Sequence, residues 1–211
     1  MLELTNLTTA TSITSALLDV RKAYRLLADY QQRILELLGF IREELGADYY
    51  LQIPRNRVPR SLDGLEVSNS AGQRFLPFND ISVLWLRNSG QEDPVHCHEK
   101  GDLLFDVWVR NDTGNGEDAE EASNVENSRS ELRIYIFQCV EPHKGPYNWR
   151  SQIWDLSYYP ATGEVLECDG NPGYRAYAET LDLSVCTDEN AIRTALNGLR
   201  KRASEKLDQQ I

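Results

Sequence analysis

Apolar residues recur at alternating spacings of three and four along the first quarter of the chain, which is the pattern of a heptad repeat. The series runs through Leu17, Val20, Tyr24, Leu27, Ile34, Leu38, Ile41 and Leu45, and Gln31 is its one polar member. Gly46 follows at a point where helices commonly end in a left-handed residue. The spacing predicts a long amphipathic helix over residues 12–45.

The apolar face of this predicted helix is wider than the seam of a two-stranded coiled coil. Ala28, Leu35 and Leu37 stand beside the seam, where such a coil would carry mostly charged residues. The face therefore packs either within the chain or against a second copy of it. The residues that we expect at such an interface are Leu17, Tyr24, Leu27, Gln31, Ile34 and Leu38.

After Gly46 the pattern changes to the period of two that is typical of strands. Strands are predicted at residues 49–53, 81–87, 102–110, 131–140 and 181–186, and the turn sequence at 160–163 predicts a hairpin of 152–159 with 164–168. An apolar stripe predicts a final helix over residues 188–207. We expect a single α+β domain over residues 1–211, with an antiparallel sheet of roughly five to seven strands within 47–186 between a long N-terminal amphipathic helix and a shorter C-terminal helix.

Residues 111–130 interrupt the pattern of strands. They hold two glycines and a run of acidic side chains, but only one large apolar residue. Such a segment buries too little apolar surface to offset the entropy of ordering its backbone. The sequence therefore predicts a mobile acidic loop between two paired strands.

Composition and charge narrow the classes of partner. The net charge of −11 repels phosphate backbones, so nucleic acid is not an expected partner. No apolar run reaches the roughly 18 residues of a membrane span, and the first ten residues lack the features of a signal peptide. The four cysteines include no C-x-x-C pair, which favours reduced thiols. We expect a cytoplasmic protein without a membrane partner.

One short stretch carries candidate metal ligands. His96 and His98 stand two residues apart, so on an extended backbone both imidazoles would point the same way. Asp102 follows four residues later, and His143 is the only other histidine. These four residues are the candidate ligands of a divalent metal. The competing interpretation is a set of solvated loop residues, and no other cofactor is indicated.

Asp106 stands among apolar residues in the middle of a predicted strand, where a carboxylate needs a partner. Arg110 and Arg133 are the expected partners. The order Asp106, Glu131, Arg133 also resembles the Asp…Glu-x-Lys arrangement of restriction-type nucleases, with Arg where those enzymes have Lys. The departure from Lys and the acidic net charge favour a structural ion pair.

Aromatic side chains concentrate between residues 147 and 177. They indicate core and sheet packing, with a small-ligand pocket near Trp149 and Trp154 as an alternative. The chain has no G-x-S-x-G sequence, phosphate-binding glycine loop or dinucleotide fingerprint. The leading hypothesis is a non-catalytic domain that binds a protein partner or a second copy of itself. An acidic inhibitor or immunity-type protein is one form of it, and a metal-dependent enzyme with a site near His96, His98 and Asp102 is the alternative.

Overall fold

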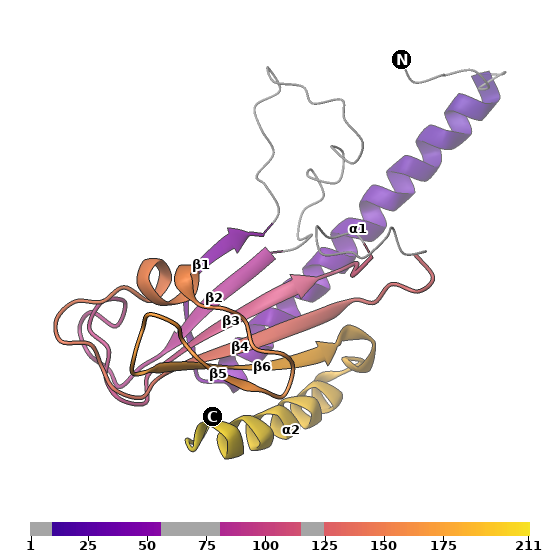
Figure 1. Cartoon of the computed structure of the whole chain (residues 1–211). Helices are drawn as coiled ribbons and strands as arrows, with labels where there is room; N and C mark the ends of the chain where they lie inside the picture. The colour runs from indigo at the N-terminus through magenta and orange to yellow at the C-terminus, as the bar shows by residue number, and fades with distance from the viewer. Residues whose placement is uncertain (1–9, 56–80, 115–124) are drawn as a thin grey trace, which may run out of the picture. The chain divides into compact units, whose positions relative to one another are not determined.

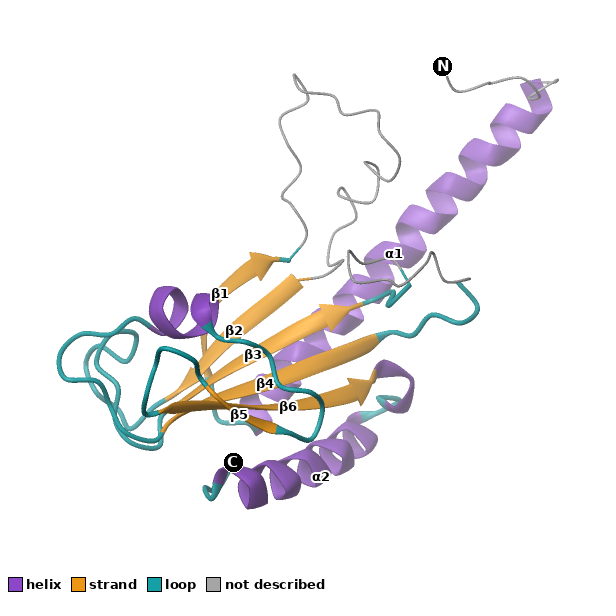
Figure 2. Cartoon of the chain, in the orientation of Figure 1, coloured by secondary structure: helices purple, strands orange, loops and turns teal. Residues whose placement is uncertain are grey.

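The computed structural model describes residues 10–55, 81–114 and 125–211 and shows the expected α+β fold (Figures 1 and 2). Helix α1 (Ala10–Glu44) comes first, one antiparallel sheet follows, and helix α2 (Glu189–Leu207) comes last. The chain divides between Phe40 and Ile41 into two units, so most of α1 belongs to the first unit and the sheet to the second. No helix in the described residues is long and apolar enough to cross a membrane.

The sheet has the strand order β1-β2-β3-β4-β6-β5, and every neighbouring pair of its six strands is antiparallel. The strands are β1 (Asp48–Pro54), β2 (Ile81–Arg87), β3 (Leu103–Arg110), β4 (Glu131–Cys139), β5 (Val165–Glu167) and β6 (Tyr174–Asp182). β3 and β4 lie in the interior and are almost wholly buried. β1 and β5 form the two edges.

Successive side chains on a strand point to opposite faces of the sheet, and apolar side chains lie on both faces here. On one face, α2 packs against β6, as Figures 1 and 2 show. The buried stripe of α2 consists of Ile192, Leu196, Leu199, Ala203 and Leu207. At its margin the Arg202 guanidinium forms an ion pair with Glu179 of β6, with Nε 2.7 Å from Oε1.

The other face packs against segments between the strands. Two short turns of helix, η3 (Trp149–Ile153) and η4 (Trp154–Leu156), place apolar side chains on it. The buried cluster here comprises Leu84, Leu86, Leu104, Tyr135, Phe137, Cys139, Trp149, Ile153, Trp154, Cys168, Tyr174, Ala176 and Ala178. Most of the aromatic residues between 147 and 177 thus pack in the core, as the sequence predicted.

The predicted hairpin of residues 152–159 with 164–168 is wrong. Residues 149–156 are helical, because a helical turn places Trp149 and Ile153 on the same side, whereas a strand would put neighbouring Ile153 and Trp154 on opposite faces. The Asn148 side chain caps this turn by accepting a hydrogen bond from the Ser151 amide. β5 pairs with β6 instead.

Most of strand β6 was missed in the sequence, which predicted only residues 181–186. Alanines at 176 and 178 and charges at 175 and 179 weaken its β-strand signal. Tertiary partners compensate, because Arg175 donates to Gln138 Oε1 and Glu179 pairs with Arg202. After β6, residues 183–185 form a 3₁₀ turn where the sequence predicted strand.

The other predicted elements are confirmed. α1 and α2 begin and end within two residues of the predictions, and Gly46 has the left-handed φ of +61° expected at the end of the first helix. Strands β1 to β4 match the four predicted strands before residue 141. The centre of the predicted acidic loop, residues 115–124, lies outside the described residues. The single-domain organisation stays a prediction.

Candidate functional site

Asp106 lies at the centre of β3 with no exposed surface, and Arg55 is its ionic partner. Arg55 Nη2 is 2.6 Å from Asp106 Oδ2. The same carboxylate oxygen accepts hydrogen bonds from Trp154 Nε1 at 2.7 Å and from the Tyr159 hydroxyl at 3.0 Å. Arg55 also donates through Nε to Ser82 Oγ at 2.6 Å. Residues from four separate segments therefore meet at one buried carboxylate.

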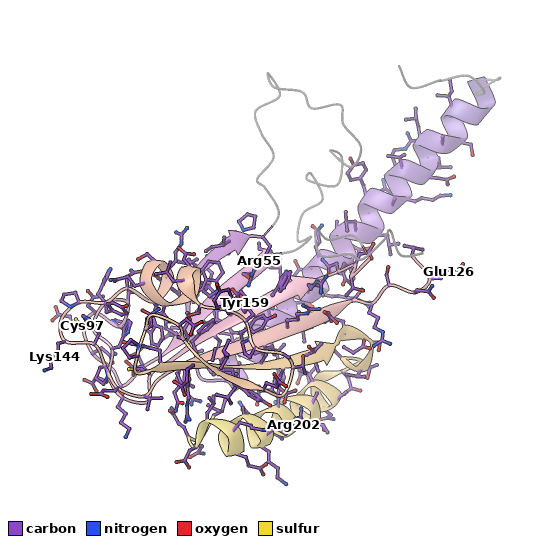
Figure 3. All side chains as sticks on the ribbon, viewed as in Figure 1. Arg55, Cys97, Glu126, Lys144, Tyr159 and Arg202 are labelled. Atoms are coloured by element: carbon purple, nitrogen blue, oxygen red, sulfur yellow. The ribbon has the colours of Figure 1, made fainter. Side chains whose placement is uncertain are left out.

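Three aromatic rings surround the Arg55 guanidinium. Its Cζ lies 4.5 Å from the ring centre of Trp108, 4.7 Å from that of Tyr159 and 5.3 Å from that of Trp154. Such contacts stabilise a cation through the negative faces of the rings. In Figure 3, Arg55 and Tyr159 lie close together at one side of the sheet. We call Asp106, Trp108, Trp154 and Tyr159 the aromatic cage.

The carboxylate of the aromatic cage is only partly satisfied. The hydrogen bonds from Arg55, Trp154 and Tyr159 all reach Oδ2, while Oδ1 is buried and has no hydrogen-bond partner. Burial raises the pKa of Asp106, and the charge of Arg55 opposes that shift. Burial also raises the pKa of Tyr159, so its phenol stays protonated and donates to the carboxylate.

Asp106 is not the partner of Arg110 or Arg133, contrary to the sequence-based expectation. Both of these arginines donate to Glu131 Oε1, at 3.3 Å and 2.7 Å. The strand register pairs Asp106 with Tyr135 and Glu131 with Arg110. The two acids are thus four positions apart, about 13 Å along the strands. They cannot share a metal ion, so the geometry does not support a nuclease site.

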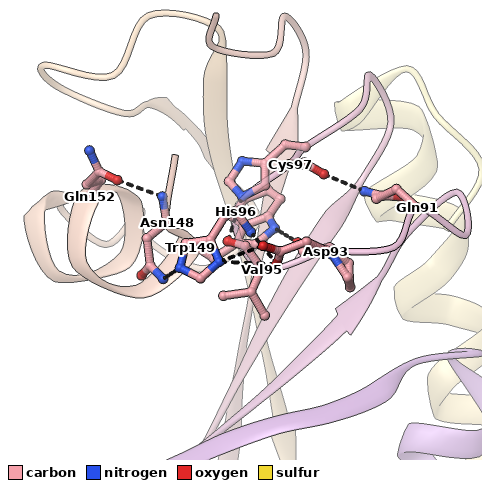
Figure 4. Close-up of polar contacts among 10 residues, drawn as sticks. Gln91, Asp93, Val95, His96, Cys97, Asn148, Trp149 and Gln152 are labelled. Carbon is pink, nitrogen blue, oxygen red and sulfur yellow. Dashed lines mark hydrogen bonds and ion pairs between the residues drawn. The ribbon is translucent and has the colours of Figure 1, made fainter. Parts of the chain in front are cut away.

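The candidate metal ligands lie in the loops at the other end of the sheet, and Figure 4 shows His96 with its partners there. His96 Nδ1 is 3.1 Å from both carboxylate oxygens of Asp93, and Nε2 is 3.0 Å from Asn148 Nδ2. The His96 carbonyl also accepts a hydrogen bond from the Tyr147 amide. This histidine joins two loops that are distant in sequence.

His98 packs against core residues. Its Nδ1 is 2.8 Å from the Tyr174 hydroxyl, its Nε2 is 3.1 Å from the Val95 carbonyl, and its ring stacks on Trp149 with centres 4.1 Å apart. Because a carbonyl can only accept, Nε2 carries a proton. Burial lowers the pKa of His98, which favours the neutral ring. Both of its nitrogens are therefore occupied.

The other two candidate ligands also have different partners. Asp102 accepts hydrogen bonds from the backbone amides of Ser89 and Glu99 and from the Gln91 side chain, so it fixes the loop before β3. His143 stacks on Tyr147 with ring centres 4.3 Å apart. Within the described ranges, no group of three or more His, Cys, Asp or Glu residues is arranged to hold a metal ion. The metal site stays a prediction without geometric support.

The six predicted interface residues follow a gradient along α1. Leu17 and Tyr24 are exposed, at 52% and 71% of their surface, and Leu27 and Gln31 are half-buried. Ile34 and Leu38 are buried, at 4% and 6%. The heptad face is therefore buried toward its C-terminal end and exposed toward its N-terminal end.

Reasoning from the sequence missed Arg55 and the aromatic cage. Arg55 follows Pro54 at the end of an edge strand and belongs to no periodic pattern. The one available signal was Asp106, whose apolar neighbours on β3 required a cationic partner. The predicted small-ligand pocket would have used Trp149 and Trp154, but both are buried in the core cluster, and Trp154 serves the cage through Nε1.

Comparison with known proteins gives one consistent match. The PM0109 family matches residues 10–208 of the chain. The chain is also similar to the protein described as "Uncharacterized protein PM0109" from Pasteurella multocida (strain Pm70). The two are 40% identical over 202 residues, which covers 93% of this chain and 96% of that protein. No solved structure matches.

Proposed function

The chain belongs to the PM0109 family, and we propose that it is a non-catalytic binding domain that pairs with a second copy of itself through the first half of α1. The observation that carries this proposal is a single apolar stripe with two different environments. Ile41 and Leu45 are buried at 0% and 2%, whereas Leu17, Val20 and Tyr24 on the same stripe are 52%, 48% and 71% exposed.

The exposed half of the stripe has the geometry of a helix–helix seam. Its heptad spacing continues the buried half without a break, so side chains at seven-residue intervals can insert between those of an identical helix. Ala16, Ala23 and Ala28 flank the seam and allow close approach of a second backbone. Each apolar square ångström removed from water contributes about 25 cal/mol, which favours covering this face.

Charge also favours a second copy as the occupant. Residues 13–31 carry three basic and two acidic side chains, in a chain whose net charge is −11. Two acidic chains therefore meet at a segment that lacks the acidic excess of the whole chain, which weakens their mutual repulsion there. Arg21 is the one charged residue beside the seam within this segment, on the e position of the heptad.

Light scattering coupled to size-exclusion chromatography tests the proposal. The wild-type chain should elute with twice the mass of 24.1 kDa, and Tyr24→Glu should elute as a monomer. Leu26→Glu is the matched control, because Leu26 is 73% exposed on the same helix but lies off the stripe. A monomeric wild type would contradict the proposal, as would equal effects of the two substitutions.

Two narrower expectations accompany this proposal. A cytoplasmic location is supported by four free thiols, two of them buried at Cys139 and Cys168, because such thiols persist in reducing compartments. Cell fractionation tests it. The acidic net charge supports an inhibitor that covers a basic protein, whose binding should weaken as salt is raised.

A further inference from the structure

The aromatic cage has the composition of a site for a cation. It combines a fully buried carboxylate with three rings whose faces meet at one point, and in this structure the point is held by the chain's own Arg55. Aromatic rings around a carboxylate select cations, because the ring faces and the acid are all negative toward the centre. The chemistry of the cage is therefore that of guanidinium or ammonium recognition.

Arg55 leaves part of the hydrogen-bonding capacity of the Asp106 carboxylate unused. Of the two carboxylate oxygens, its Nη2 donates only to Oδ2; Nη2 also donates to the Tyr159 hydroxyl at 2.7 Å, and Nε donates to Ser82 Oγ. Oδ1 remains buried without a partner. A guanidinium approaching head-on can donate two parallel hydrogen bonds, one to each oxygen. A ligand free of the geometry of β1 would thus satisfy an atom that Arg55 leaves unsatisfied.

The cage and its occupant also differ in how firmly they are held. Asp106 and Trp108 belong to β3 in the interior of the sheet, and Trp154 is buried in the core. Arg55 comes from the end of β1, an edge strand that pairs only with β2 among the described strands, and its side chain is 19% exposed. Edge strands open locally at lower cost than interior strands. Three of the four cage residues are therefore held by the interior of the domain, whereas their occupant comes from its edge.

We propose that the aromatic cage is a recognition site for a guanidinium group and that Arg55 occupies it as an internal substitute for that ligand. This proposal does not depend on pairing of two copies through α1. The guanidinium belongs either to an arginine side chain of a partner protein or to a small free compound. Arg55 sets the apparent affinity, because an external ligand must compete with a tethered group.

The test uses full-length Arg55→Ala with methylguanidinium as the probe, at constant ionic strength. Binding is followed by the NMR signal of the Trp154 indole N–H, which donates to Asp106. We expect Arg55→Ala to bind methylguanidinium at least about tenfold more tightly than the wild type does, with a dissociation constant near 1 mM. A chain that is unfolded without the probe and refolds as it is added gives the same support.

Two further variants decide the outcome. Arg87→Ala is the matched control, because Arg87 also lies over a ring, that of Phe105 at 5.9 Å, but donates to the Gln210 carbonyl instead of to a buried acid. It should show no gain in binding. Adding Asp106→Asn to Arg55→Ala should abolish the binding. The proposal is overturned if Arg55→Ala binds no probe below about 10 mM, or binds it equally with and without Asp106.

A second probe identifies the source of the guanidinium. A capped Gly-Arg-Gly peptide that binds Arg55→Ala as tightly as methylguanidinium does would assign the site to protein arginine. Binding of methylguanidinium alone would assign it to small free compounds. If Arg55→Ala does not fold under any condition, Arg55→Lys is used instead. The lysine ammonium is a compact charge that fits a planar guanidinium site less well, so it competes less strongly with the probe. Failure of Arg55→Lys to bind the probe more tightly than the wild type would also overturn the proposal.

Discussion

Asp106 shows how one buried charge depends on a single partner. The carboxylate has no exposed surface, and Arg55 supplies the only positive charge among its hydrogen-bond donors in the described part of the chain. Removing one member of a buried ion pair leaves the other charge uncompensated. Replacing both with apolar residues of similar volume often restores stability.

We therefore expect Arg55→Met to lower the free energy of unfolding by about 3 to 5 kcal/mol. The double variant Arg55→Met/Asp106→Leu should recover most of that loss, since it removes the unpaired charge as well. Urea titration of both variants measures the two values. A double variant no more stable than Arg55→Met would show that the loss arises from packing and not from the charge.

His98 makes stability depend on pH. Its pKa lies below the ordinary value of 6.5, because burial disfavours the imidazolium. As pH falls below 6.5, the unfolded chain takes up a proton that the folded chain does not, so stability is lost downward from that value. The contribution of His98 is fully present above 6.5.

Urea unfolding at about pH 7.5 and about pH 5.5 should therefore show a less stable protein at the lower pH. His98→Phe keeps a ring that can stack on Trp149 but cannot titrate. This variant should lose part of the difference between the two pH values. An undiminished difference would assign the pH dependence to other groups.

At the scale of elements, glycines with positive φ angles form the turns that connect segments of the sheet. Gly173 has a φ of +94°, and its carbonyl accepts hydrogen bonds from the amides of Val140 and Glu141. A Cβ atom at this position would collide with the Glu141 carbonyl oxygen. Gly163 has a similar φ of +83°, but open space surrounds its Cβ position.

Alanine substitutions at Gly163 and Gly173 distinguish the cost of backbone strain from the cost of a steric collision. Gly163→Ala should cost about 1 kcal/mol, the price of placing a side chain in the left-handed region. Gly173→Ala should cost about 3 kcal/mol or more, because the collision adds to that strain. Thermal unfolding of both variants measures the difference, and equal losses would show that the Glu141 backbone yields freely.

At the scale of the whole molecule, the exposed stripe on α1 links helix formation to association. Most helical stability in proteins comes from packing an apolar face and not from intrinsic helix propensity. If a second copy covers residues 13–31, dilution must weaken the helix there. The circular dichroism signal at 222 nm should then fall on dilution of the wild type and stay constant for Tyr24→Glu. A wild-type signal independent of concentration would argue against pairing.

The sequence by itself determined the elements whose signal is local and periodic. The heptad pattern located α1 to within two residues, alternation located β1 to β4, and Gly46 marked the end of α1. These predictions succeeded because side-chain period reflects backbone geometry directly. The same reasoning failed for residues 152–159 and for most of β6, where distant partners outweighed local preference.

Only the tertiary structure decided which side chains meet. The sequence showed that Asp106 needed a cation, but Arg110 and Arg133 were nearer along the chain than Arg55, and both pair with Glu131. The register aligns Asp106 with Leu84 of β2 and Leu51 of β1, so Arg55, which lies beyond the end of β1, reaches Asp106 only through its side chain. No periodic pattern encodes such a contact across 51 positions. The extended backbone assumed for His96 and His98 is not present, because residues 94–97 form turns and bends, and the His98 ring bonds Tyr174 in the core. Side-chain periodicity therefore predicts helices and strands, whereas the contacts that build a site depend on how those helices and strands pack.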